Sequence, residues 1–256
     1  MLVLGQISNR EELEQKFEIE FRVKSNNFVP NYNLRPGSQA TVITTDFPQS
    51  FTAYAYGLTP FWASNKVTLY EAPVDGDIPV YPPKGTLHKR IIQMPAFRKP
   101  IRQQRCIIPV DYFITVENSQ AFMFSLNTHR PFAIAGVYDH WKLTIKDEVL
   151  STGFCPVTLP QVYFPSISIK RIPLILHPRN YKKWLSKEAP LSAVTDLLDF
   201  YPEDEITAYP VDFNLINKGV NDNRIIKPMG SPVKSKMSDD KNLLDYIKNL
   251  RSRHRY

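Results

Sequence analysis

The residues best suited to chemistry in this sequence are basic and aromatic side chains that lie close together along the chain. Phe61 and Trp62 precede a run of basic residues interleaved with apolar ones. Lysine and arginine neutralise phosphates, and aromatic rings stack on unpaired bases with about 1–3 kcal/mol per base. This pattern is consistent with a surface that binds nucleic acid, with a solvated basic face and a core Trp62 as the alternatives. The basic run consists of Lys84, Lys89, Arg90, Arg98, Lys99, Arg102 and Arg105.

Few side chains could act as nucleophiles or bases. Cys106 and Cys155 each lie in an apolar, strand-like stretch, which predicts two buried thiols in a reducing cytoplasm. Neither cysteine has a general base beside it in the sequence. His177 stands at the end of a predicted strand, where histidine is usually exposed rather than catalytic. We expect no metal site and no cofactor.

The composition describes an ordinary water-soluble protein with a basic excess. The chain has 256 residues, a formal net charge of +7 and 22 prolines against nine glycines. Residues 233–256 hold seven Lys or Arg and three Asp, so this tail supplies +4 of the charge. The sequence contains neither a long apolar run for a membrane span nor a recognisable signal peptide. We predict a single domain over residues 1–232, a basic tail at 233–256, and a cytoplasmic location.

The predicted elements are mostly short strands, and they favour an α+β fold of barrel-like, bent antiparallel sheets with peripheral helices. Ser8 and Glu11 have the spacing of a capping box for a helix at residues 8–17. A long irregular loop is predicted for the proline-rich residues 63–88. Strands are predicted at 41–45, 51–57, 106–116, 121–126, 132–138, 153–159 and 205–211, and helices at 178–185, 191–200 and 239–253.

Six segments carry motifs that occur together, and in this order, in one known family. They are NYNLRPG at residues 31–37, AYGLTPFWA at 55–63, PAFR at 95–98 with RCIIPVD at 105–111, PFAIAGVYDHW at 131–141, RIPLIL at 171–176 and the closing segment at 217–228. In these segments the chain resembles the SOS response-associated peptidase family, the abasic-site processing proteins. The resemblance implies a single-domain mixed fold with a positively charged groove for single-stranded DNA.

The resemblance also implies a covalent reaction, for which this sequence lacks the side chains. In the family, the amine and thiol of an N-terminal Cys attack the aldehyde of an abasic site, and a Glu and a His assist. The Cys position falls on Leu2, or on Leu4 if Gly5 and Ser8 are matched to the family. The Glu position falls on Thr115 and the His position on Ile169. None of these replacements can titrate, so we expect no catalytic residues.

The residues that resemble the family's binding surface are retained. We predict a catalytically inactive relative, linked to the DNA damage response, that binds single-stranded or abasic DNA. The alternatives are a residual peptidase or lyase-type enzyme, and a non-enzymatic scaffold that binds a protein partner through the C-terminal helix. The predicted nucleic-acid-binding residues are Asn33, Pro60, Phe61, Trp62, Arg90, Arg98, Lys170 and Arg171.

Overall fold

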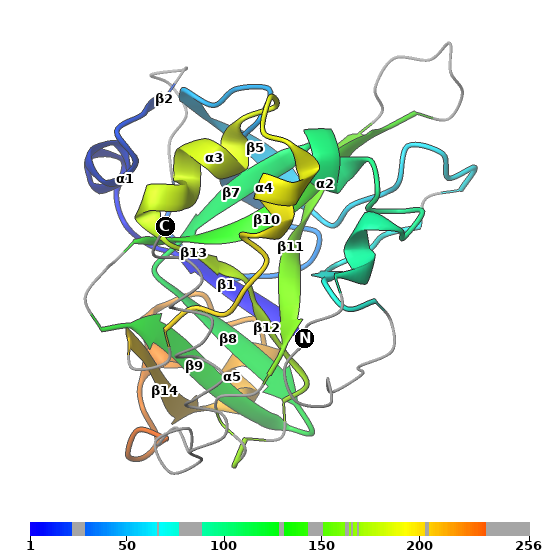
Figure 1. The fold of residues 1–256 in the computed structure, drawn as a ribbon. Coiled ribbons are helices and arrows are strands. Elements are labelled where there is room, and N and C mark those ends of the chain that lie inside the picture. Colours follow the sequence, from blue (N-terminus) through cyan, green and yellow to red (C-terminus); the bar gives the residue numbers. More distant parts are fainter. Residues whose placement is uncertain are drawn as a thin grey trace.

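A computed structural model shows two sheets stacked one above the other, with short helices at the periphery (Figure 1). It describes residues 1–21, 29–65, 67–76, 89–127, 131–142, 151–161, 164, 166–167, 169–202 and 205–233. Lys84 and the helix predicted at 239–253 lie outside these residues. No helix in the described part of the chain is long and apolar enough to cross a membrane.

Five strands close into a barrel in the upper part of Figure 1. They follow the order β5-β4-β7-β10-β11, and β11 then pairs with β5. This closing pair is parallel, whereas the other four pairs are antiparallel. The sequence predicts antiparallel sheets, so the parallel pair that closes the barrel differs from the prediction. The strands are β4 (Gln39–Thr44), β5 (Ser50–Tyr56), β7 (Arg105–Val110), β10 (Phe132–Trp141) and β11 (Ser151–Pro160).

Two glycines allow the closing strands to approach each other. A Cβ atom on Gly153 would lie 2.0 Å from the backbone oxygen of Gly57. Gly57 itself has a φ of +136°, a conformation that side chains disfavour, and its N–H donates to the carbonyl of Phe154 at 2.7 Å. The barrel seam therefore requires glycine at both positions.

The second sheet is a five-stranded antiparallel layer with the order β14-β9-β8-β1-β3. A single strand had been predicted at 106–116, but the structure divides it at Asp111, where the chain leaves the barrel. The Asp111 carboxylate accepts hydrogen bonds from the backbone N–H groups of Ile7 and Ser8 and from the Ser8 hydroxyl. The strands are β1 (Leu2–Gln6), β3 (Asn31–Leu34), β8 (Tyr112–Glu117), β9 (Gln120–Leu126) and β14 (Ile206–Val211).

The helices are short and lie outside the sheets. The capping box of the first helix lies one residue later than predicted, because Asn9 and Glu12, not Ser8 and Glu11, form it, and the helix begins at Arg10. The helix predicted at 191–200 ends at Thr195. The helices are α1 (Arg10–Phe17), η1 (Arg90–Ile92), α2 (Pro100–Gln103), η2 (Pro178–Asn180), α3 (Tyr181–Leu185), α4 (Leu191–Thr195), α5 (Phe213–Asn217) and η4 (Asn223–Ile226).

Short strands extend the barrel at its edges. The residues predicted to form an irregular loop at 63–88 include β6, and only residues 63–65 and 67–76 of that range are described. β12 pairs with the end of β11, which brings residues 171–173 close to β6. These strands are β2 (Glu20–Phe21), β6 (Ala72–Pro73), β12 (Arg171–Pro173) and β13 (Ile175–Leu176).

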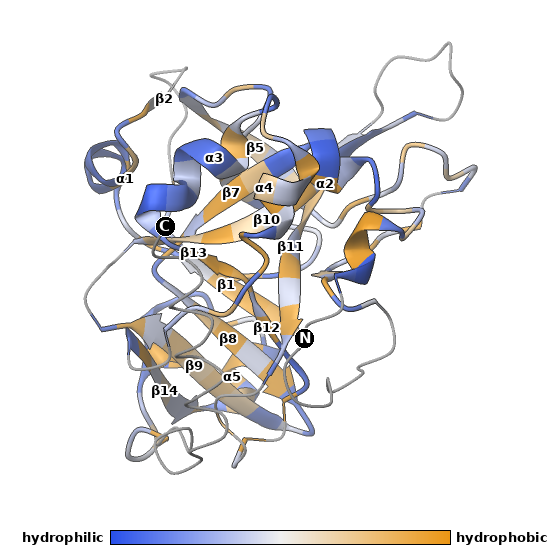
Figure 2. Ribbon diagram, viewed as in Figure 1, coloured by the Kyte–Doolittle hydropathy of each residue, from blue (hydrophilic) through white to orange (hydrophobic). Residues whose placement is uncertain are grey.

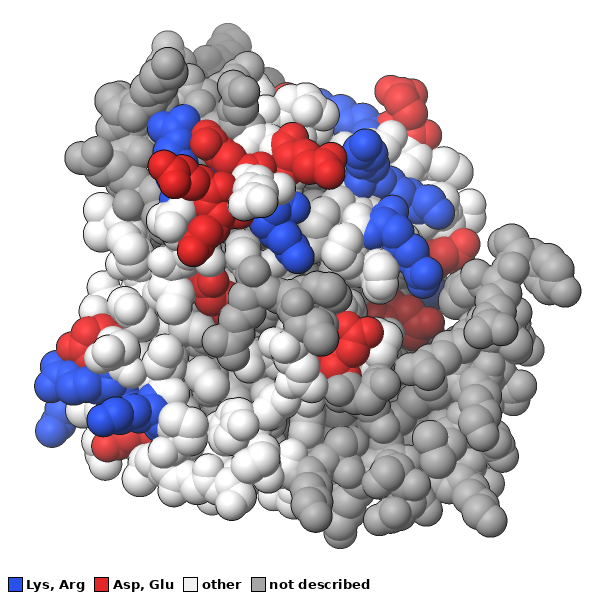
Figure 3. Space-filling model, turned by 90° about the vertical axis from the view of Figure 1, so that its left-hand side faces the viewer, with Lys and Arg blue, Asp and Glu red and all other residues white. Residues whose placement is uncertain are grey.

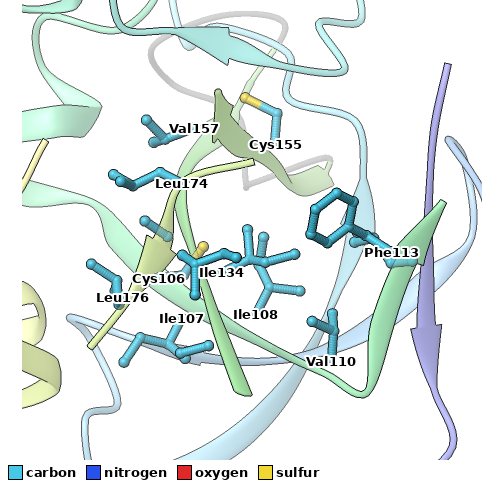
Figure 4. Close-up of a cluster of buried hydrophobic side chains, with 14 of the residues drawn as sticks. Cys106, Ile107, Ile108, Val110, Phe113, Ile134, Cys155, Val157, Leu174 and Leu176 are labelled. Atoms are coloured by element: carbon cyan, nitrogen blue, oxygen red, sulfur yellow. The ribbon is translucent and has the colours of Figure 1, made fainter. Parts of the chain in front are cut away.

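The core is continuous through the barrel and reaches the second sheet. The strands are largely hydrophobic, whereas α1 and α3 present hydrophilic residues outward (Figure 2). Side chains of β7, β10 and β11 meet in a cluster that includes Ile108, Ile134 and Val157, with Phe113 of β8 beside it (Figure 4). Cys106 and Cys155 lie in the same cluster, which confirms the prediction of two buried thiols. Burial raises the pKa of both thiols, so neither is a nucleophile near neutral pH.

Candidate nucleic-acid interface

Phe61 and Trp62 are exposed on a turn that hydrogen bonds fix to the barrel. Their side chains are 45% and 55% exposed, so the alternative of Trp62 as a core residue is wrong. The Phe61 N–H donates to the Asp139 carboxylate at 2.9 Å, and the Trp141 indole donates to the Ala63 carbonyl at 2.8 Å. Both anchors come from β10. The turn is therefore fixed at two points while its aromatic pair faces solvent.

The Asp139 carboxylate is an unusual anchor, because it is almost fully buried. Burial raises the pKa of Asp139, while hydrogen bonds from the N–H groups of Phe61 and His140 and the charge of Lys99 act in the opposite direction. Neither Asp139 nor Trp141 was predicted as part of the site. The available signal in the sequence was their spacing of two residues, which places both side chains on the same face of a strand.

Basic side chains of residues 98–102 adjoin the aromatic turn. The Lys99 ammonium lies 4.2 Å from the centre of the Phe61 ring, within the range of a cation–π contact. The Trp62 indole donates to the Pro95 carbonyl at 3.3 Å, which brings the segment with Arg98 alongside. Arg98 and Arg102 are exposed, and Arg102 donates to the carbonyls of Ile92 and Arg98. The surface formed by Phe61, Trp62, Arg98 and Lys99 is called the aromatic–basic step below.

Arg105 does not belong to this basic surface, which corrects the run inferred from the sequence. Its side chain is fully buried, and its guanidinium donates to the carbonyls of Ile101, Arg102, Trp184 and Ser186. Desolvation lowers its pKa to about 10. Arg105 therefore holds α3 against the barrel. The sequence did not predict its burial, because a fully buried arginine is rare.

Arg90 and Arg171 lie together at a second place on the surface. Arg90 packs against Gly76, and Arg171 donates to the Gly76 carbonyl at 3.0 Å. Arg171 also forms a 2.6 Å ion pair with Asp75, which is buried. Lys89, next to Arg90, donates to the Thr195 carbonyl and so supports α4. Of this group, Arg90 is the exposed cation.

Lys170 is exposed and lies beside an acidic residue that the sequence did not single out. Its ammonium is 3.7 Å from Glu117, and its backbone N–H donates to the same carboxylate at 3.1 Å. Glu117 lies two residues after Thr115 on β8, so both side chains occupy the same face of that strand. This contact places the 169–171 segment beside the end of β8.

The positions that correspond to the family's reactive Cys and Glu are neighbours in the second sheet. Leu2 of β1 lies directly opposite Thr115 of β8, while Leu4 lies opposite Phe113. The Thr115 side chain is only 5% exposed, and its hydroxyl has no hydrogen-bond partner among the described residues. Ile169, at the position of the family's His, is buried in the apolar core. At these matched positions the side chains are therefore apolar groups and one hydroxyl, where the resemblance implies a thiol and titratable groups.

Asn33 is an internal brace. Its amide nitrogen donates to the carbonyls of Ile216 and Val220 at 3.3 and 2.8 Å, and its oxygen accepts from Arg35 at 2.8 Å. These bonds hold the closing segment of the domain against β3. His177 has a local role too, since its ring accepts a hydrogen bond from the Arg179 N–H at the start of η2.

The fold combines a closed barrel with a second antiparallel sheet, and the aromatic turn lies next to the basic segment. These features define the class of protein to which this chain belongs. The profile of the family described as SOS response associated peptidase (SRAP) matches residues 4–218. The chain therefore belongs to the SRAP family.

Relatives and solved structures agree with this assignment. The abasic site processing protein YoqW of Bacillus subtilis (strain 168) is 27% identical over 221 residues, which cover 84% of this chain and 92% of YoqW. YoaM of the same organism, also named an abasic site processing protein, is 27% identical over 218 residues, covering 82% and 90% of the two chains. A crystal structure of a protein from Bacteroides thetaiotaomicron superposes with a TM-score of 0.72 at 20% identity, covering 89% of this chain and 99% of the other. A protein from Bordetella bronchiseptica superposes with a TM-score of 0.61 at 19% identity, covering 82% and 99%. These structures share the fold, which confirms the predicted fold class.

Proposed function

We propose that this protein binds single-stranded DNA, including DNA with abasic sites, and forms no covalent bond to it. The abasic-site processing names of its relatives support a role connected with DNA damage. The replacement of the reactive residues by Leu2, Thr115 and Ile169 supports non-covalent binding. The DNA-damage role and the lack of chemistry are thus separate parts of the proposal.

The observation that carries the proposal is the aromatic–basic step. A solvent-exposed tryptophan and phenylalanine on a fixed turn are costly to leave in water unless a partner covers them. Bases of a single strand offer flat faces that stack on such rings, and Arg98 and Lys99 lie where backbone phosphates would follow. Duplex DNA hides its base faces, so the step favours single strands.

The charge distribution on another face of the molecule also favours the aromatic–basic step as the binding surface. Among the described residues on the face that carries α1, acidic side chains lie beside basic ones (Figure 3). Arg90, Lys170 and Arg171 lie outside the step and are a second candidate contact for the DNA backbone, although Asp75 and Glu117 neutralise part of the charge of Arg171 and Lys170. Pro60 shapes the turn, and Asn33 contributes by bracing the fold.

Fluorescence polarisation with a labelled single-stranded oligonucleotide tests the proposal. Trp62→Ala is expected to weaken binding by about 1–3 kcal/mol, which is about 5- to 150-fold in Kd. Met229→Ala is the matched control, since it removes an exposed apolar side chain next to β14 instead. Equal affinity of the two variants would show that the step is not the binding surface, and a scaffold role would replace this one.

A further inference from the structure

A hydroxyl, an imidazole and a carboxylate lie in a hydrogen-bonded row on the barrel, away from the aromatic–basic step. His140 Nδ1 is 2.8 Å from the hydroxyl oxygen of Thr152, and His140 Nε2 is 3.3 Å from the Asp46 carboxylate. His140 and Thr152 are opposite residues of β10 and β11, so the sheet itself sets the first contact. Asp46 lies in the turn between β4 and β5.

The row is separate from the proposed DNA surface because of the alternation along β10. Asp139 and Trp141 point to the aromatic turn, and His140, between them, points to the opposite face of the strand. The side chains of His140 and Asp46 are 32% and 28% exposed, so a small molecule in solution can reach them.

Neighbouring groups hold the row in one arrangement. The Lys187 ammonium donates to the second Asp46 oxygen at 2.6 Å. The rings of Tyr54 and Tyr138 meet the His140 ring edge-on, with centroids 6.4 and 5.4 Å away. The Tyr138 hydroxyl is also 3.0 Å from the hydroxyl of Thr45. Burial alone would raise the pKa of Asp46, but hydrogen bonds from Lys187, Tyr138 and His140 lower it below its ordinary value.

The protonation states follow from the partners. An ionised Asp46 can only accept a hydrogen bond, so His140 carries its proton on Nε2. Its Nδ1 then presents a lone pair to Thr152, whose hydroxyl donates to it. A nucleophile next to a base that a third group orients is the arrangement that activates a hydroxyl for covalent catalysis.

We propose that Thr152, His140 and Asp46 form an acyl-transfer site that cleaves small, activated carboxylic esters. The Thr152 oxygen bonds to the ester carbonyl carbon while its proton passes to His140 Nδ1. The carbon–oxygen bond to the leaving alcohol then breaks, and that alcohol takes the proton from His140. Water repeats the sequence on the acyl-threonine, which releases the carboxylic acid and restores the hydroxyl. Asp46 keeps its charge and stabilises the imidazolium in each step.

Hydrolysis of p-nitrophenyl acetate by the full chain tests this site. Thr152→Val keeps the β-branched shape and is expected to lower the rate at least about tenfold, as loss of an activated nucleophile should. His140→Gln and Asp46→Asn are expected to lower it too, while Thr41→Val, on β4 of the same barrel and outside the row, should leave it unchanged. Circular dichroism of each variant checks that the barrel remains folded.

The site of acylation distinguishes the proposal from simple imidazole or amine chemistry. After an acid quench, mass spectrometry of peptides is expected to find the acetyl group on Thr152 in the unaltered protein and nowhere on that peptide in Thr152→Val. An acetyl group found only on lysine or histidine, or a Thr152→Val rate equal to that of the unaltered protein, would overturn the proposal. DNA binding does not enter either readout, so this result is independent of the proposed function.

Discussion

Leu2 lies directly opposite Thr115 in the antiparallel ladder between β1 and β8, with Tyr56 donating a hydrogen bond to the Leu2 carbonyl at 3.3 Å. Two cross-strand neighbours have side chains close enough to interact. A reactive group at one position would therefore face the other, yet neither residue can titrate. The two positions are therefore neighbours, and neither carries a titratable side chain.

We predict that this protein forms no heat-stable adduct with abasic single-stranded DNA on a denaturing gel. A Leu2→Cys variant produced without Met1 supplies the nucleophile only. Adding Thr115→Glu and Ile169→His should raise its crosslinking rate by about 10²–10⁴-fold, the usual contribution of general acid–base groups. Equal rates for the single and triple variants would contradict the account, as would an adduct with the unaltered protein.

Gly153→Ala is expected to prevent normal closure of the barrel. Its Cβ would lie 2.0 Å from the Gly57 oxygen, and that contact is with backbone, which cannot move aside alone. We expect a loss of more than about 3 kcal/mol in the free energy of unfolding, measured by urea denaturation. Gly37→Ala is the control: its added Cβ meets nothing within 4 Å, and only its φ of +92° is unfavourable, so a loss of about 1 kcal/mol is expected.

Arg105 and Arg98 should behave in opposite ways. Arg105→Met removes the donor from the buried carbonyl of Trp184 and the partly buried carbonyl of Ser186, which should reduce the free energy of unfolding by about 3 kcal/mol or more. Arg98→Ala should barely change stability and should instead flatten the salt dependence of DNA binding by about one phosphate contact. Denaturation and polarisation on both variants check this, and a stable Arg105→Met protein would be inconsistent with its buried role.

Asp46 gives a pH dependence whose sign follows from its lowered pKa. The folded protein binds fewer protons at this carboxylate than the unfolded chain, so the stabilisation is present above the ordinary pKa of 3.8. It is lost as the pH falls from there through the lower pKa of the folded state. Asp46→Asn should therefore be less stable at pH 7, by under about 1 kcal/mol because the group is partly exposed. The difference should shrink in acid, and a gap that widens in acid would refute this assignment.

Much of the fold could be predicted from the sequence, because strand periodicity and turn residues are local signals. The strands predicted at 121–126 and 132–138 were confirmed, as was a helix within residues 8–17. The break at Asp111 was missed, since its cause is a set of hydrogen bonds to residues more than 100 positions away.

The site was harder to predict, because its side chains depend on tertiary partners. Asp139 in the anchor of the aromatic turn, Asp75 beside Arg171 and the burial of Arg105 all arise from contacts between distant segments. Sequence patterns predict which face of a helix or strand is buried, but they do not say which distant residues that face will contact.

The central claim, binding of single-stranded DNA by the aromatic–basic step, is tested most directly by a salt titration of two proteins. One is the full chain and the other ends after Val233, which removes the basic residues that follow. We predict that the shorter protein still binds a single-stranded oligonucleotide at low salt, with an affinity that falls by a slope of about −0.7 per phosphate contact. No affinity of the folded shorter protein at low salt would contradict the claim and leave the tail as the only binding element.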